Sequence, residues 1–187
     1  MNIILFGPPG AGKGTQAKYL VNKINGFQIS TGEILRDEIY KNSDIGKKIT
    51  NDMNDGKFVS DEIVNELIKD MIFDSQKKNR LIFDGYPRSI SQARNLDIFL
   101  KKSDQKINFV FFLNVNKDVI IKRIEKRKNL ENRSDDDLNT ILKRYDTYME
   151  TTKPVLEYYS KNPNFHEIDG ALEIDQITNK IDAFLGV

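Results

Sequence analysis

The 187-residue sequence contains no cysteine. Without thiols the chain can form neither a disulfide framework nor a thiolate zinc site, which suits a reducing compartment. Long apolar runs are missing too, since none approaches the ~20 residues that a membrane-spanning helix needs. A charged leader with a removable apolar segment is also missing, so we expect a cytoplasmic protein without a membrane partner.

An excess of charge of either sign is likewise missing. Lysine and arginine number 29 against 28 aspartate and glutamate, a formal net charge of +1. Such a chain has no global basic field for nucleic acid or for an anionic membrane, so an anion must be bound by a local cluster. Histidine is scarce: His166 stands alone, in a predicted strand where we expect a structural role. The length suits one domain with a substantial core.

The N-terminal stretch carries the clearest functional signal. Apolar residues 3–6 suit a strand buried on both faces, and a glycine-rich segment follows. Residues 7–13 fit G-x-x-x-x-G-K, a pattern in which backbone N–H groups cradle phosphates and the lysine reaches the terminal ones. Apolar spacing over 13–24 predicts a helix whose N-terminus favours negative charge. We therefore predict a phosphate-binding loop rather than an ordinary glycine turn.

The position after the lysine departs from the general pattern. Gly14 stands where a serine or threonine usually binds Mg²⁺, and the hydroxyl comes one residue later, at Thr15. We therefore expect a nucleotide-bound Mg²⁺ to be held largely by phosphates and water. Asp84 ends a predicted buried strand, where an unpaired carboxylate is costly. It is expected either to reach the metal through water or to pair with an arginine or lysine.

Predicted strands and helices alternate along the rest of the chain. Further strands are predicted at 26–30, 80–84, 107–115 and 165–168. Helical apolar spacing lies between them, with a weak helix at 47–54 and one long helix from 135 to about 159. This alternation predicts a parallel sheet covered on both faces, so we expect a five-stranded three-layer α/β fold. Such sheets bind ligands beyond the carboxyl ends of their strands.

Arginine is the other prominent feature. Six arginines fall at loop or helix positions that can meet at this edge of the sheet: Arg36, Arg88, Arg123, Arg127, Arg133 and Arg144. A guanidinium group is always charged and matches phosphate bidentately. For one arginine alone, a surface ion pair is the expected role, but six near a phosphate loop indicate a shared anion site.

Several motifs, in chain order, resemble those of nucleoside monophosphate kinases, most closely the adenylate kinases. They are GPPGAGKGT at 7–15, STGEILR at 30–36, DGYPRSISQA at 84–93, the paired Arg123 and Arg127, RSDD at 133–136 and KRY at 143–145. The resemblance covers essentially the whole chain. It implies a single P-loop kinase domain, 1–187, with a helical segment at about 30–59 that binds the monophosphate and a short lid at about 128–136.

The resemblance also implies site residues. Those around ATP are Gly10, Ala11, Gly12, Lys13, Gly14, Thr15, Arg127 and Leu172. Those around AMP are Thr31, Arg36, Lys57, Phe58, Val59, Gly85, Tyr86, Pro87, Arg88, Gln92, Arg133 and Arg144. Those that stabilise the transferred phosphoryl group are Lys13, Arg88, Arg123, Arg133 and Arg144.

The implied reaction is reversible transfer from Mg-ATP to AMP, giving two ADP, by a monomer. Only five residues separate Arg127 from Arg133, as in the short-lid form of the family, and this removes any prediction of zinc. The nucleophile would be an AMP phosphate oxygen, already anionic because its second pKa is about 6, so no general base is required.

Three other functions stay open from the sequence. A UMP/CMP kinase shares nearly all of the motifs, although Thr31 and Gln92 resemble adenine-contacting residues. A GTPase switch is a different class; 116–118 come close to the guanine-reading N-K-x-D, with the aspartate one place early. A purely structural adaptor is disfavoured by the intact loop.

Overall fold

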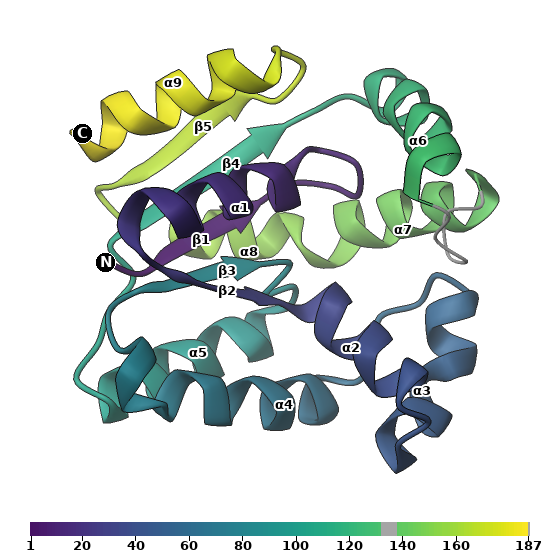
Figure 1. Cartoon of the computed structure of the whole chain (residues 1–187), viewed down its shortest axis with the longest axis horizontal. Coiled ribbons are helices and arrows are strands. Elements are labelled where there is room, and N and C mark those ends of the chain that lie inside the picture. The colour runs from purple at the N-terminus through teal and green to yellow at the C-terminus, as the bar shows by residue number, and fades with distance from the viewer. Residues whose placement is uncertain (132–137, 187) are drawn as a thin grey trace.

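The computed structural model describes residues 1–131 and 138–186. Five parallel strands form one sheet in the order β2-β3-β1-β4-β5 (Figure 1). The strands are β1 (Ile3–Phe6), β2 (Phe27–Ser30), β3 (Leu81–Asp84), β4 (Phe109–Asn114) and β5 (Phe165–Asp169). The predicted five-stranded parallel sheet is therefore confirmed.

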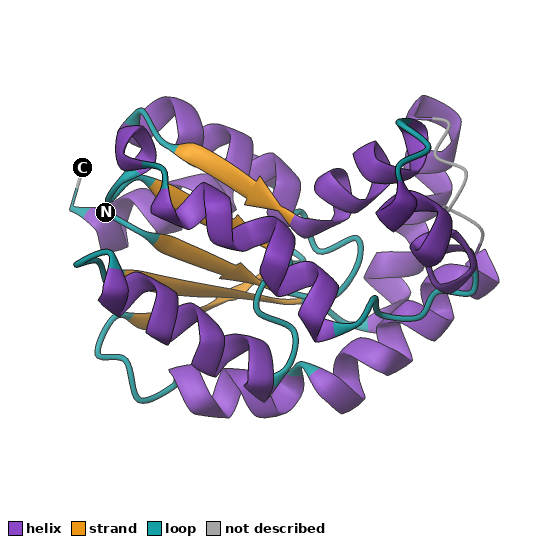
Figure 2. Ribbon diagram, turned by 90° about the horizontal axis from the view of Figure 1, so that it is seen from below, coloured by secondary structure: helices purple, strands orange, loops and turns teal. Residues whose placement is uncertain are grey.

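Helices cover both faces of the sheet, so the fold has three layers (Figure 2). One face packs against α4 (Asp61–Phe73), α5 (Ile90–Lys102) and α8 (Lys153–Tyr159). The other packs against α1 (Lys13–Ile24), α6 (Lys117–Glu131) and α9 (Ile174–Leu185). Because successive side chains of a strand point to opposite faces, Ile4 and Phe6 of β1 serve the first layer while Ile3 and Leu5 serve the second.

Three further helices lie at or beyond the carboxyl ends of the strands (Figure 1). They are α2 (Thr31–Tyr40), α3 (Asp44–Asn54) and α7 (Leu138–Thr151); a short 3₁₀ turn, Ser75–Lys77, precedes β3. Ser30 caps α2, since its hydroxyl accepts the Glu33 N–H at 3.4 Å. No helix within the described residues is long and apolar enough to cross a membrane.

The prediction of one long helix from 135 to about 159 was wrong, because two helices occupy the part of this range that the structure describes. The first, α7, ends at Thr151, and α8 begins at Lys153. Pro154, at the start of α8, has no N–H to donate to the carbonyl of Glu150, so the helical hydrogen-bond ladder is interrupted there. The side chain of Thr152, at the junction, donates to the Arg88 carbonyl at 3.2 Å.

The starts of α3 and α4 are stabilised in different ways. The helix predicted from residue 47 begins earlier, at Asp44, because the Ser43 hydroxyl caps it by accepting the Gly46 N–H at 2.9 Å. Ser60 does precede α4, but its side chain makes no capping hydrogen bond. The acids in the first turn of α4, Asp61 and Glu62, instead complement the positive end of the helix dipole.

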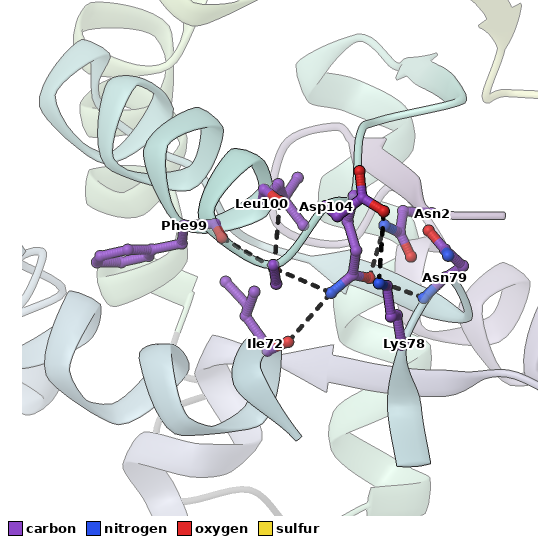
Figure 3. Close-up of polar contacts among 9 residues, drawn as sticks. Asn2, Ile72, Lys78, Asn79, Phe99, Leu100 and Asp104 are labelled. Carbon is purple, nitrogen blue, oxygen red and sulfur yellow. Dashed lines mark hydrogen bonds and ion pairs between the residues drawn. The ribbon is translucent and has the colours of Figure 1, made fainter. Parts of the chain in front are cut away.

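A buried amide ties strands together at the amino edge of the sheet, opposite the loops that follow the strands (Figure 3). Asn2 is fully buried, and its Oδ1 accepts the Leu81 N–H of β3 at 3.0 Å. Its Nδ2 donates to the Gln105 Oε1 and to the Lys106 carbonyl, both at 3.1 Å. Gln105 in turn donates to the Ile72 carbonyl at 3.2 Å. This network fixes the starts of β1 and β3 relative to the segment that leads into β4.

We predict that Asn2→Ala lowers the free energy of unfolding by about 2–3 kcal/mol, because it leaves the buried hydrogen-bonding groups around Asn2 without their partner. Urea denaturation measures the change, with the exposed Asn22→Ala on α1 as control, expected within about 0.5 kcal/mol of the wild type. An Asn2→Ala protein as stable as the control would show that the network contributes nothing net.

Candidate functional site

The predicted phosphate loop joins β1 to the first residue of α1, Lys13. Gly12 precedes the helix at φ +96°, a backbone conformation that residues with a Cβ rarely adopt. The Lys13 ammonium donates to the Gly7 and Pro8 carbonyls at 2.7 and 3.0 Å. A cation is therefore held across the loop at a helix N-terminus, the usual arrangement of a phosphate-binding loop.

The far end of the chain also reaches this loop. Arg123 of α6 donates from Nη1 to the Ala11 carbonyl at 3.4 Å and from Nη2 to the Leu172 carbonyl at 3.2 Å. Arg123, predicted to stabilise the transferred phosphoryl group, thus contacts Ala11 and Leu172, two residues predicted around ATP. Arg127 lies on α6, but its side chain, like the whole of Arg133, is outside the described residues, as are 132–136 of the predicted lid.

Asp84 ends β3 beside the loop. A Cβ on Gly14 would lie 3.7 Å from its Oδ2, so the carboxylate faces the start of α1. The Gln28 amide of β2 donates to this Oδ2 at 3.0 Å, and the carboxylate is also near enough to Arg88 to raise the pKa of the guanidinium group. Sequence reasoning missed Gln28, whose strand position gave no sign that its side chain reaches across to β3. Among the described residues, no three His, Cys, Asp or Glu side chains gather as a metal site.

A second site lies on the other side of Asp84, between α2, α4 and the loop after β3. The pocket is lined by Thr31, Leu35, Phe58, Val59, Val64, Gly85, Arg88 and Gln92. Six of these eight residues belong to the predicted AMP set. The cavity encloses about 20 Å³, room for about one water molecule, so in this conformation side chains fill most of it.

Arg88 makes several of the contacts in the lining of the pocket. Its Nε donates to the Gly85 carbonyl at 2.7 Å, and its guanidinium group lies 4.8 Å from the centre of the Phe58 ring. The Thr31 hydroxyl donates to the same carbonyl at 2.7 Å. Glycine suits position 85, because φ is +76° and a Cβ would lie 2.8 Å from Arg88 Nη2 and 2.9 Å from Thr31 Oγ1, so that a side chain there would be strained and would displace both.

The charges around Arg88 indicate an anion site. Burial lowers the pKa of Arg88 to about 10; the Asp84 carboxylate raises it, whereas the guanidinium groups of Arg144 and Arg36 lower it. Arg144 also donates from Nη2 to the Met53 carbonyl at 3.1 Å, which joins α7 to α3. Three like charges from separate elements repel one another here, and a bound phosphate would reverse that repulsion.

The rest of the predicted AMP set occupies varied positions. Lys57 is exposed and pairs with Asp55 at 3.0 Å. Tyr86 is buried; its hydroxyl donates to Asn65 Oδ1 at 2.6 Å, and its peptide bond to Pro87 is cis. The Gln92 side chain, 3% exposed, is hydrogen-bonded within the protein at both its oxygen and its nitrogen.

Sequence reasoning missed the helical support behind Arg88. Besides Thr152, it comprises Tyr148 of α7, which is buried and close enough to Arg88 for the guanidinium group to act on the pKa of the tyrosine. Burial raises the pKa of the Tyr148 hydroxyl, whereas Arg88 and a hydrogen bond from the Gly7 backbone lower it. Tyr148 is therefore near both Arg88 and Gly7, the first residue of the phosphate loop. The helical pattern of 138–149 gave no signal for it.

The near match to a guanine-reading motif has a structural explanation. The Asn116 side chain accepts the Val119 N–H at 3.0 Å and so caps the start of α6. Lys117 pairs with Asp146 of α7 at 3.4 Å. These residues therefore stabilise a helix start and its neighbour, as an Asx cap commonly does.

Comparison with known proteins agrees with this geometry. The sequence model of a family described as adenylate kinase matches residues 5–164. An adenylate kinase of Pelagibacter ubique (strain HTCC1062) is 50% identical over an alignment of 213 positions, which covers all of both chains. An adenylate kinase of Caulobacter sp. (strain K31) is 41% identical over 187 residues, all of this chain and 99% of the relative. Since the family model covers most of the sequence and these relatives align over the whole of it, this chain belongs to the adenylate kinase family.

Proposed function

We propose that this protein catalyses reversible transfer of the γ-phosphoryl group from ATP to AMP, giving two ADP. The observation that carries the proposal is the cluster of Arg36, Arg88 and Arg144 at a small pocket, with Tyr148 near both Arg88 and Gly7 of the phosphate loop. A nucleotide hydrolase needs only the loop. A cationic cluster between two sites suits transfer between two phosphorylated molecules.

ATP is assigned to the loop side. Residues 10–15 would cradle its phosphates through backbone N–H groups, with the Lys13 ammonium exchanging its loop carbonyls for phosphate oxygens. Arg123 and Arg127 would lie along the phosphates. The backbone at Leu172, which Arg123 already contacts, would lie against the adenine.

AMP is assigned to the pocket side. Thr31 and Gln92 would contact its base, with 57–59 and 85–87 as the surrounding wall, whereas Arg36 and Arg88 would bind its phosphate. Arg88 would have to leave the Gly85 carbonyl for this, a change in which a neutral hydrogen bond is replaced by a charge-assisted one.

The chemistry requires positioning rather than proton transfer. The attacking AMP oxygen is already an anion, so the protein has to align it with the γ-phosphorus and stabilise the charge on the transferred oxygens. Lys13, Arg88, Arg123, Arg133 and Arg144 are the groups we assign to that stabilisation. Excluding water from the two sites would be the role of the segments at about 30–59 and 128–136.

The site also fits the Mg²⁺ that accompanies ATP. Asp84 offers a carboxylate beside the loop, held by Gln28, and Gly14 leaves the space next to it free of a side chain. The metal would be held by phosphates and water with Asp84 behind the water, and when bound it would neutralise charge on the transferred group. No zinc is proposed. We expect a cytoplasmic monomer.

We predict that Lys13→Ala lowers kcat/KM for ATP by at least ~10²-fold with the fold intact, because it removes an electrostatic donor from the transferred phosphates. A coupled ADP-formation assay measures it, and far-ultraviolet circular dichroism checks folding. Lys18→Ala, exposed on α1, is the matched control and is expected to behave as the wild type. Near wild-type turnover in Lys13→Ala would refute the phosphate-loop assignment.

We predict that Arg88→Ala lowers kcat/KM for AMP by at least ~10²-fold, since one side chain orients the acceptor and stabilises the transferred charge. Arg94→Ala, which removes an exposed arginine from the adjacent α5, is the control. Initial rates over a range of AMP and ATP concentrations separate the two sites. A change confined to the KM for ATP would show that Arg88 acts on ATP and that its assignment to AMP is wrong.

We predict that the wild-type protein prefers AMP to CMP and UMP by orders of magnitude in kcat/KM, because a pocket that hydrogen-bonds a base edge strongly rejects mismatched groups. Thr31→Ala is expected to relax this preference while ATP binding changes little. Incubation with Mg-ATP and each monophosphate, followed by chromatography of the products, measures both. Equal turnover of CMP and AMP would favour a UMP/CMP kinase and refute AMP as the acceptor.

A further inference from the structure

The amide of Gln92 is fixed at both of its polar atoms. Its Oε1 accepts the Arg88 backbone N–H at 2.7 Å, and its Nε2 donates to Asp61 Oδ1 at 2.6 Å. A backbone N–H can only donate and an ionised carboxylate can only accept. The two ends of this amide are therefore identified by chemistry, and the reverse orientation would place like groups against each other at both ends.

Asp61 is itself held in place. It is the first residue of α4, and its Oδ2 accepts the Ser89 hydroxyl at 2.6 Å. Ser89 caps α5 by accepting the Gln92 N–H at 3.1 Å, so the carboxylate, the cap and the amide form one closed network. With a side chain only 3% exposed, Gln92 also has little space in which to rotate.

This fixed amide still has capacity for a ligand. A primary amide carries two N–H donors and two oxygen lone pairs, and the network uses one of each. One donor and one acceptor remain on a side chain that lines the acceptor pocket. Adenine and cytosine present an amino group beside a ring nitrogen acceptor, whereas uracil and guanine present a carbonyl beside a ring N–H. For a base held in one pose, only the first pattern suits an amide whose ends cannot exchange.

We propose that Asp61 is a specificity-determining positioning residue: it holds the Gln92 amide in the orientation that accepts an amino-bearing base edge and rejects a carbonyl-bearing one. The inference rests on the proposed acceptor site. In the wild type, turning the amide around places Oε1 against the Asp61 carboxylate and Nε2 against the Arg88 N–H. An asparagine at 61 can donate as well as accept, so it removes the first of these penalties and leaves the second.

The test is Asp61→Asn, assayed with Mg-ATP and AMP, CMP or UMP. The ratio of kcat/KM for AMP to that for UMP is expected to fall by about tenfold, the size of one charge-assisted hydrogen bond. The ratio for AMP to CMP is expected to change little, because these two bases share the amino pattern and differ in ring size. A merely structural effect would move both ratios together, and a partly unfolded sample would move neither.

Glu62→Gln is the matched control, since it removes an exposed carboxylate from the same first turn of α4 and is expected to leave both ratios unchanged. Asp61→Ala, in which nothing faces the Gln92 nitrogen, is expected to shift the AMP-to-UMP ratio in the same direction as Asp61→Asn. Gln92→Ala separates the inference from the base contact on which it rests. If Gln92→Ala lowers the AMP-to-UMP ratio and both Asp61 variants keep it, the role of Asp61 is refuted while the base contact stands. If Gln92→Ala also keeps it, the base contact fails and the inference fails with it.

Discussion

Mutual repulsion among Arg36, Arg88 and Arg144 is the constraint on which the rest of the site depends. These side chains come from α2, from the loop after β3 and from α7, and the parallel sheet delivers all three to one edge. Their charges act on one another in a partly buried setting, where water screens them poorly. Backbone carbonyls hold two of the three: Gly85 accepts from Arg88, and Met53 from Arg144. The Asp84 carboxylate is near enough to raise the pKa of Arg88, and an anion bound between the arginines would offset their repulsion further.

Polar side chains have different roles at the amino and carboxyl edges of the sheet. At the amino edge, the Asn2 side-chain amide donates two hydrogen bonds and accepts one, so both its nitrogen and its oxygen are hydrogen-bonded within the protein. At the carboxyl edge, Arg88 lines the small pocket and donates to the Gly85 carbonyl, a hydrogen bond that it would give up for a phosphate on the proposed assignment. The network at the amino edge thus contributes to the stability of the sheet, whereas the polar groups at the carboxyl edge are those that we assign to binding.

The sequence predicted what depends on local pattern. The phosphate loop with its strand and helix is a contiguous motif, and the strand–helix alternation was enough to predict the layers. The break at Pro154 was also local and was missed only because the apolar spacing continues through it. The contacts that shape the acceptor side are of another kind. Gln28 meets Asp84 across 56 residues, Asp61 meets Gln92 across 31, and Thr152 meets Arg88 across 64. No spacing rule predicts such pairs, because they depend on how separate elements pack.

The hydrogen bonds already present in the small pocket bear on which molecules can bind there. Both the Thr31 hydroxyl and the Arg88 guanidinium donate to the Gly85 carbonyl, so this carbonyl is not available to accept a hydrogen bond from a base. On the proposed assignment, only a phosphate offers Arg88 a better partner than the carbonyl it has. A free nucleoside brings no such group and meets a guanidinium still in place over Phe58. On this assignment, a molecule without a phosphate would leave the Arg88 guanidinium group in place, so nucleosides are expected to bind poorly whatever their base.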